Sequence, residues 1–457
     1  MSRRTVLFWL LLSTAASVGW GYWIGYTKNA GFGDFRAVYF AARTAIAHQD
    51  PYNPTEFLQV YQREGGEIPT DPVRLRDFRR AITVCVNLPS TLLVVMPIAL
   101  LGWLPAQLVW MVLMPAGFLL AAWLIWDLAE GRAPTITLFL LCLLVGNCQV
   151  LLQLGNASGM SVVLGVIAVW CFLRERYIPA GILCMTLALA IKPQEVAFIW
   201  LYLVLAGGAL RRRAWQTLIV TLILVAVSIA WVSHVSPNWL AEWHANAAST
   251  TVHGDLNDPG PTSIGNTKVG MIISLQSVLS FFEDDPAIYN PLTWLMVGIP
   301  ILIWAVIAVR SRPSRQYTWL GIASISALSL LPVYHRQYDA KLLFLCIPAL
   351  AVLWGEGSRL RKPAILVTTA GILLTADVPL AIFNLINKAL HLPQDELAGK
   401  LAAILLTRTP TLALGAMGAF YLWAYIRCAW AALSEERNMP ALVTGANVTS
   451  CLFEVGE

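Results

Sequence analysis

One aspartate stands where a short amphipathic helix is predicted, directly after the first apolar segment of the chain. The stretch from Gly31 to Pro54 has polar edges, and its apolar residues between Phe35 and Ile46 recur at helical spacing. Asp34 falls in the first turn of this helix. Its side chain can cap the helix, which aspartate does well, or act as a general base at a membrane surface. The two roles are compatible.

A turn-forming sequence from Asp50 to Pro54 follows the helix. Aspartate, asparagine and proline favour turns. Asn53, with Glu56 three residues later, predicts the N-cap and its partner at the start of a second short helix. We therefore expect two short helices at the membrane surface, with a carboxylate at the start of the first.

Two ionisable residues, Lys192 and Glu195, lie deep in an apolar stretch. An ionisable group inside a membrane segment costs about 3 kcal/mol and usually faces a cavity or a partner of opposite charge. The two residues therefore form an ion pair at a helix break, or Lys192 faces a cavity where its charge suits a lipid phosphate. Both interpretations remain open from the residues alone.

Three further polar positions interrupt apolar segments. The sequence from Tyr334 to Lys341 is either a plain turn or a site where His335 and Arg336 bind a phosphate or orient a hydroxyl group. The break at Gly155-Asn156 is more simply a turn. Asp377 is costly in a late helix unless it stands near the helix end, as the neighbouring Pro379 suggests.

Motifs for nucleotide, nucleophile and metal chemistry are absent from the sequence, which contains no GxxxxGK[ST], GxSxG, HExxH or DxD. The eight cysteines include no CxxC pair, and most lie in apolar segments as small hydrophobic residues. We therefore expect no metal ligands and no cofactor. An enzyme of this kind would need a substrate that already carries an activated group.

The composition is that of a polytopic membrane protein. Hydrophobic residues make up 58% of the chain and charged residues only 12%, against about 25% in soluble proteins. The net charge of +5 comes from short basic clusters between apolar runs, which topology explains, so the sequence indicates no nucleic-acid partner. Membrane lipid is the expected surrounding.

Apolar segments long enough to cross about 30 Å of hydrocarbon are predicted along the whole chain. The clearest cover residues 5–26, 83–101, 105–126, 134–152, 215–234, 291–309, 317–333, 339–354, 364–385 and 409–430. Residues 159–173 add a short span, and residues 177–207 form one long helix broken at Lys192-Pro193 or two short helices. The fold class is thus an all-α bundle of about twelve, possibly thirteen, transmembrane helices.

Basic clusters predict the orientation of the bundle. Arg3-Arg4 and Arg211-Arg212-Arg213 lie at helix ends, which the positive-inside rule places in the cytoplasm. Both termini are then cytoplasmic, and the loops 27–80 and 235–290 are external. Trp239 and Trp243 predict a surface-lying helix in the second loop. One conflict arises, because Arg174 and Arg176 would be external in a bundle of twelve helices.

The chain is expected to form one integral-membrane domain, residues 1–433, followed by a loose cytoplasmic tail, residues 434–457. A protein of this kind in a bacterial-type envelope would lie in the plasma (inner) membrane, with its polar site open to the external, periplasmic face. No internal repeat or inverted symmetry is visible, which argues mildly against common transporter designs.

Several short motifs resemble glycosyltransferase family 87, a group of the GT-C superfamily that contains polyprenol-phosphate-mannose-dependent mannosyltransferases. The resembling residues, in chain order, are Gly33-Asp34-Phe35, Tyr39, Ala41-Ala42, Asp50-Pro51-Tyr52, Asn87-Leu88-Pro89, Pro97, Leu104-Pro105, Gly155-Asn156, Gly181, Lys192-Pro193 and His335. The chain departs from the family pattern in having Pro89 alone where a proline pair is common and Gly155-Asn156 where Gly-Gln is common.

The resemblance implies a GT-C transferase that moves a hexose, with mannose expected, from a polyprenyl-phosphate sugar to a lipid-linked or cell-envelope glycan. Asp34 would be the catalytic base, and Lys192 and His335 would be polar contacts of the substrate. Five further residues are expected to bind substrate: Arg336, Tyr39, Arg43, Tyr52 and, at the Gly-Asn break, Asn156. Departure of a phosphate needs little protonation, so one base and nearby cations suffice without a metal, and the anomeric centre is inverted.

Two other classes of protein remain open. A transporter or flippase of lipid-linked sugars also places cations and carboxylates inside a helix bundle, although it would need access from both faces and ionisable groups near the midplane. A non-catalytic membrane partner that retains the fold is the third possibility, and the presence of Asp34 argues against it.

Overall fold

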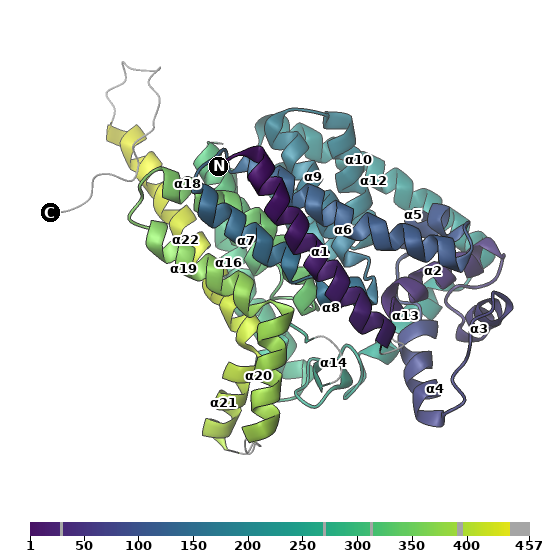
Figure 1. Cartoon of the computed structure of the whole chain (residues 1–457). Coiled ribbons are helices and arrows are strands. Elements are labelled where there is room, and N and C mark those ends of the chain that lie inside the picture. Colours follow the sequence, from purple (N-terminus) through teal and green to yellow (C-terminus); the bar gives the residue numbers. More distant parts are fainter. Residues whose placement is uncertain (28–30, 268–270, 311–313, 391–395, 439–457) are drawn as a thin grey trace.

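The computed structural model of the protein is a bundle of helices (Figure 1), and it describes residues 1–27, 31–267, 271–310, 314–390 and 396–438. The predicted all-α class is confirmed: the described residues form no strand, and Ile272 and Arg336 make one isolated antiparallel bridge. The longest helices are α1 (Arg3–Thr27), α6 (Trp103–Leu128), α12 (Gly208–Val235), α16 (Pro286–Arg310) and α22 (Thr409–Asn438).

Shorter apolar helices complete the bundle. They are α5 (Pro89–Ala99), α7 (Pro134–Gly146), α8 (Gln149–Leu154), α9 (Ser158–Arg174), α10 (Ile178–Ile191), α11 (Pro193–Leu205), α17 (Arg315–Leu328), the 3₁₀ helix η2 (Gln337–Cys346), α18 (Ile347–Gly355), α19 (Arg361–Leu374), α20 (Asp377–Leu390) and α21 (Leu397–Thr407). Among the described residues, seven helical segments are long and apolar enough to cross a membrane, and the bent pair α19 and α20 would make an eighth. The protein is therefore an integral membrane protein.

Several predicted spans are broken in the structure. The segment expected at 83–101 is helical as α5 only from Pro89, because proline starts a helix well but cannot continue one. The segment expected at 134–152 is split into α7 and α8, and the side chain of Asn147 binds the carbonyl of Leu143 at the break. The segment expected at 364–385 bends by 70° between α19 and α20. Hydropathy averages over such breaks.

The two long loops carry short helices that gather at the same end of the bundle (Figure 1). The first loop contains α2 (Gly33–Ile46), α3 (Pro54–Arg63), α4 (Pro72–Phe78) and the π-helical turn η1 (Arg79–Thr83); the second contains α13 (Trp239–Thr250), α14 (Ile264–Thr267) and α15 (Gln276–Leu279). Asn246 of α13 donates to the carbonyls of Tyr52 and Cys85, and Trp243 donates to that of Val86. Helix α13 of the second loop is therefore hydrogen-bonded to the first loop and to the segment that follows it.

The local predictions for the first loop hold in part. Helix α2 buries the predicted apolar face, and Phe35 stacks on Trp110 of α6 at 4.6 Å between ring centroids. Asn53 caps α3 as expected, through bonds from the backbone N–H groups of Thr55 and Glu56. The capping role of Asp34 is wrong: the N-cap of α2 is Phe32, and it makes no side-chain cap bond.

The predicted break at Lys192 separates two helices, α10 and α11, so residues 177–207 form two short helices. Arg213, near the start of α12, lies 3.0 Å from Glu175, which directly follows α9. The helices α10 and α11 therefore leave one end of the bundle and return to it, with Lys192 at their turning point. Arg174 lies at that same end, where it pairs with Asp127, and its expected placement opposite Arg213 is wrong.

The C-terminal helix extends beyond the expected start of the tail. Helix α22 runs to Asn438, so the chain is still helical at Ser434, where a loose tail was expected. Residues 439–457, which make up the rest of the predicted tail, lie outside the described residues.

Candidate active site

One large cavity of about 1460 Å³ brings together four of the eight site residues expected from the sequence, namely Asp34, Asn156, Lys192 and Arg336. Its walls come from α2, η1, the turn between α8 and α9, the break between α10 and α11, the second loop and the segment before η2. Small-molecule sites usually enclose about 300–1,000 Å³. The cavity therefore has room for more than one substrate group.

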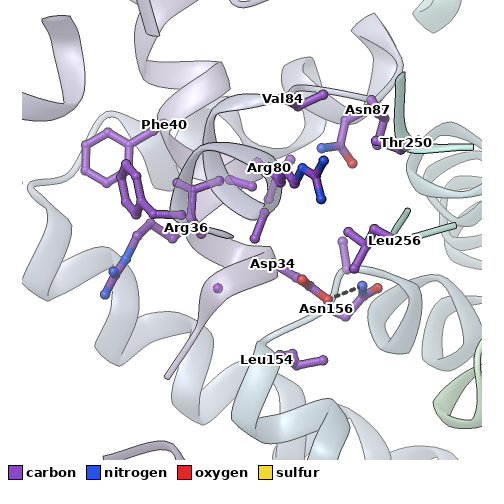
Figure 2. A pocket seen from close by; sticks show the side chains of 18 of the residues that line it. Asp34, Arg36, Phe40, Arg80, Val84, Asn87, Leu154, Asn156, Thr250 and Leu256 are labelled. Atoms are coloured by element: carbon purple, nitrogen blue, oxygen red, sulfur yellow. Dashed lines mark hydrogen bonds between the residues drawn. The ribbon is translucent and has the colours of Figure 1, made fainter. Parts of the chain in front are cut away.

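Asp34 and Asn156 face each other inside this cavity (Figure 2). The amide nitrogen of Asn156 donates to Oδ2 of Asp34 at 2.6 Å and to the hydroxyl of Tyr338 at 3.0 Å. Helix α2 brings Asp34 to the cavity wall, and the turn after α8 brings Asn156 there. The two residues are 122 positions apart in sequence.

The surroundings of Asp34 make its carboxyl group a stronger base than an aspartate in water. Burial raises its pKa above the ordinary value, while the hydrogen bond from Asn156 and the positive charges of Arg336 and Lys192 lower it. Burial is the larger effect. A raised pKa favours acceptance of a proton near neutral pH, which suits a general base.

Lys192 is both an ion-pair partner and a cavity residue. Its Nζ lies 2.8 Å from Oε1 of Glu195 and 3.1 Å from both carboxylate oxygens of Asp339 in η2. The Lys192 side chain keeps 17% of its surface exposed, whereas both acidic side chains are fully buried. The two sequence interpretations of Lys192 are therefore compatible in the structure.

Arg336 also lines the cavity, close to Asp34. It is 3% exposed, its guanidinium donates to the Tyr334 hydroxyl and, at 3.0 Å, to the carbonyl of Leu256, and its backbone N–H donates to Asp339 at 2.7 Å. The nearby phenol and carboxylate oxygens raise its pKa, so the guanidinium is charged at all working pH values. Arg336 and Lys192 together make this part of the cavity positive.

His335 is fully buried beside the cavity but does not line it. Its Nδ1 lies 3.1 Å from the carbonyl of Val333, and its Nε2 lies 3.9 Å from Glu195. Burial lowers the pKa of His335 to about 4, so the imidazole is neutral at pH 7. His335 thus lies beside Glu195 and outside the cavity wall, without direct access to a bound substrate.

Three residues expected to bind substrate lie outside the cavity wall. The Tyr39 hydroxyl donates to the carbonyl of Leu101, and the Tyr52 hydroxyl donates to the carbonyl of Asn87. Arg43 pairs with Glu64 at 2.9 Å and also binds the carbonyl of Ala99. All three side chains are occupied by contacts within the fold, and none of the three lines the cavity.

Sequence reasoning missed other cavity residues. Arg80 of η1 and Asn87 lie on the wall across from Asp34 (Figure 2), and Arg80 pairs with Asp255 of the second loop at 3.3 Å. Arg74 and Trp103 also line the cavity. Arg74 and Arg80 belong to a basic cluster in the first loop. This cluster is the sequence signal that could have identified the two arginines as candidate site residues.

One group of side chains among the described residues is arranged so that it could hold a metal ion. His253, Asp258 and Asp284 bring their ligand atoms within 4.8 Å of one another. None of these residues lines the cavity that contains Asp34. The described cavity wall brings together carboxylates, amides, phenols and cations, a set suited to acid-base chemistry and anion binding.

The fold and the cavity define an integral membrane protein with a polar site at one end of its bundle. A model of glycosyltransferase family 87 matches residues 87–333, more than half of the chain. The chain belongs to glycosyltransferase family 87 and is a membrane glycosyltransferase, as the resemblance of its short motifs indicated. No curated protein and no solved structure matches the chain significantly.

The family match covers only some of the candidate site residues. It includes Asn156 and Lys192, whereas Asp34 precedes it and His335 and Arg336 follow it. The roles of the latter residues therefore depend on the geometry of the cavity and on the sequence resemblance, not on the family match.

Proposed function

We propose that the protein transfers a hexose, expected to be mannose, from a polyprenyl-phosphate sugar to a lipid-linked or cell-envelope glycan, with Asp34 as the general base. The observation that carries this proposal is the position of Asp34: its carboxylate stands in a large cavity beside Lys192 and Arg336, the cations that a donor phosphate requires. Membership of the glycosyltransferase family supplies the reaction class.

The proposed reaction is a single displacement. Asp34 accepts the proton of the acceptor hydroxyl while the hydroxyl oxygen attacks the anomeric carbon, and the bond from that carbon to the polyprenyl phosphate breaks. The phosphate leaves as an anion, and the charges of Lys192 and Arg336 stabilise it. One displacement inverts the anomeric centre, so a β-linked donor yields an α-linked product. No metal or cofactor is part of this scheme.

The membrane setting fits a substrate with a polyprenyl chain. A polyprenyl chain would lie in the lipid. The helices of the two long loops gather at one end of the bundle (Figure 1), and residues of these loops line the cavity. By the positive-inside rule we assign this end to the external face of the plasma (inner) membrane, because Arg213 and Arg174 lie at the other end of the adjacent helices. Both termini are then cytoplasmic.

The test is transfer of radiolabelled sugar by membranes that contain the protein. A panel of polyprenyl-phosphate sugars is offered to the wild type, to Asp34→Asn and to the matched control Asp77→Asn, which removes a more exposed carboxylate from the same cavity. We expect the wild type and the control to transfer label and Asp34→Asn to lose at least about 10²-fold in rate, the usual scale for a general base.

Two results would contradict the proposal. Equal transfer by the wild type and Asp34→Asn would remove Asp34 from the mechanism. If the wild type and Asp34→Asn both moved lipid-linked sugar across vesicle membranes, without transfer from any donor, a flippase would be favoured instead. Correct folding of each variant is checked by its elution and its thermal transition in detergent.

A further inference from the structure

Asn156 has only one amide orientation that suits all of its neighbours. The backbone N–H of Ser158 donates to Oδ1 of Asn156 at 2.8 Å, so this atom is the carbonyl oxygen of the amide. The amide nitrogen then points to Oδ2 of Asp34 and to the hydroxyl of Tyr338. The flipped amide would set its oxygen against a carboxylate and its nitrogen against an N–H donor, and both contacts are repulsive.

The turn that carries Asn156 is attached to the start of α2. The backbone N–H of Phe32 donates to the carbonyl of Gln153 at 2.6 Å, and the indole of Trp110 donates to the carbonyl of Gly155 at 2.9 Å. Gly155 has a φ of +63°, and a Cβ at this position would lie 2.8 Å from Phe32. The turn and the first residues of α2 therefore form one tightly packed unit, so the Asp34 and Asn156 side chains are held in register.

The contact uses one oxygen of Asp34 and leaves the other for chemistry. Oδ2 accepts the bond from Asn156, and within the described part of the chain no partner is found for Oδ1. Asp34 is partly exposed to the cavity, so Oδ1 can meet an acceptor hydroxyl. An amide that already donates to Asp34 and Tyr338 and accepts from Ser158 has little capacity left for a sugar.

We infer that Asn156 is a positioning residue for the base: it holds the carboxylate of Asp34 so that Oδ1 faces the acceptor hydroxyl, and it does not bind the sugar itself. This replaces the substrate-binding role expected from the sequence. The inference rests on the proposed function, because it assigns to Asn156 a part in proton transfer at the same site.

The charged and titratable groups around Asp34 determine the expected pH behaviour. Arg336 and Lys192 lower the pKa of Asp34, the negative charge of Asp339 raises it, and the phenol of Tyr338 shares the Asn156 amide. Loss of the amide removes a hydrogen bond that lowers the pKa of Asp34. In Asn156→Ala the acidic limb of kcat/KM should therefore move to higher pH.

The experiment compares wild type, Asn156→Ala and the matched control Asn290→Ala, whose side chain bonds Gln276 outside the cavity. Transfer is measured over a pH series and over a range of donor and acceptor concentrations. We expect Asn156→Ala to lower kcat by about 10²-fold, the scale on which misplacement of a catalytic group acts, with the KM values unchanged. The control should keep the acidic limb of the wild type.

A rise in KM with unchanged kcat would overturn the inference, because it would make Asn156 a substrate contact. An acidic limb at the wild-type pH in Asn156→Ala would also overturn it. A wild type without transfer, or an Asp34→Asn variant as active as the wild type, would instead refute the proposed function.

A second measurement does not depend on activity. Thermal stability is compared in a double-mutant cycle of Asp34→Ala, which removes the acceptor, Asn156→Ala and the double variant. We expect the effects to be non-additive, because the two side chains share one hydrogen bond. Additive effects would show that Asn156 does not hold Asp34, whatever reaction the protein catalyses.

Discussion

Nζ of Lys192 lies 3.1 Å from each carboxylate oxygen of Asp339, although 147 positions separate the two residues. The contact joins the break between α10 and α11 to the first turn of η2, and Glu195 adds a second carboxylate at 2.8 Å. A cavity cation is thus held in place by two buried acids, and this predicts how the site responds to mutation.

Loss of Lys192 alone should lower the stability of the protein more than loss of Lys192 together with Asp339. Lys192→Met leaves two buried carboxylates without their cation, which typically costs about 3–5 kcal/mol, and Asp339→Asn removes one of the two acids that hold the lysine. We expect a large fall in thermal transition temperature for Lys192→Met and a partial recovery in the double variant with Asp339→Asn. Thermal unfolding in detergent measures this. Equal stability of all variants would contradict it.

Gly155→Ala should destabilise the protein and disturb the site. The residue has a φ of +63°, and its Cβ would lie 2.8 Å from Phe32 and 2.9 Å from Phe35. A left-handed backbone and an atomic overlap each cost about 1 kcal/mol or more. The matched control is Gly298→Ala, where a Cβ meets open space and the helical backbone favours alanine. A Gly155→Ala variant as stable as the wild type would argue against the packed turn.

Tyr39→Phe and Tyr52→Phe should affect stability rather than substrate binding. Each hydroxyl donates to a backbone carbonyl inside the fold, at 2.8 and 2.9 Å, and neither residue lines the cavity. Loss of one such hydrogen bond costs about 0.5–1.5 kcal/mol. We expect unchanged KM values for donor and acceptor in transfer assays. A several-fold rise in KM would restore the substrate-binding role predicted from the sequence.

Stability should fall as the pH rises from about 4.3, the ordinary pKa of glutamate, to about 7. The hydrogen bond with Asp50 raises the pKa of Glu242 to about 7, and burial and the negative charges of Asp50 and Glu56 add to the effect. The folded state therefore binds this proton more tightly than the unfolded state, and the resulting stabilisation is lost as the pH rises through this range. Glu242→Gln should flatten the decline in thermal transition temperature. An unchanged slope would exclude Glu242 as its cause.

Local features were predictable because they depend on neighbouring residues. The helix that carries Asp34, the Asn53 cap and the break at Lys192 all follow from side chains within one or two turns. The number of spans was not predictable in the same way. Hydropathy averages over about twenty residues, so it did not detect the late start of α5 at Pro89 or the interruption at Asn147.

Contacts between distant residues explain the remaining differences. Spacing in the sequence could not show that Arg174 pairs with Asp127, which decides the end of the bundle where α9 finishes. Spacing also could not show that Tyr39 and Tyr52 bond to backbone carbonyls inside the fold while Arg80 lines the cavity. Each outcome depends on which helices pack together.

The sequence by itself determined that the chain is a helical membrane protein, that its polar residues concentrate in a few breaks, and that these breaks resemble those of a glycosyltransferase family. Apolar length, helix-breaking residues and charge are local properties, so they can be read without coordinates. Only the tertiary structure decided which breaks meet. Asp34, Asn156, Lys192 and Arg336 share one cavity because distant helices pack side by side, and that packing depends on long-range contacts that no local pattern encodes.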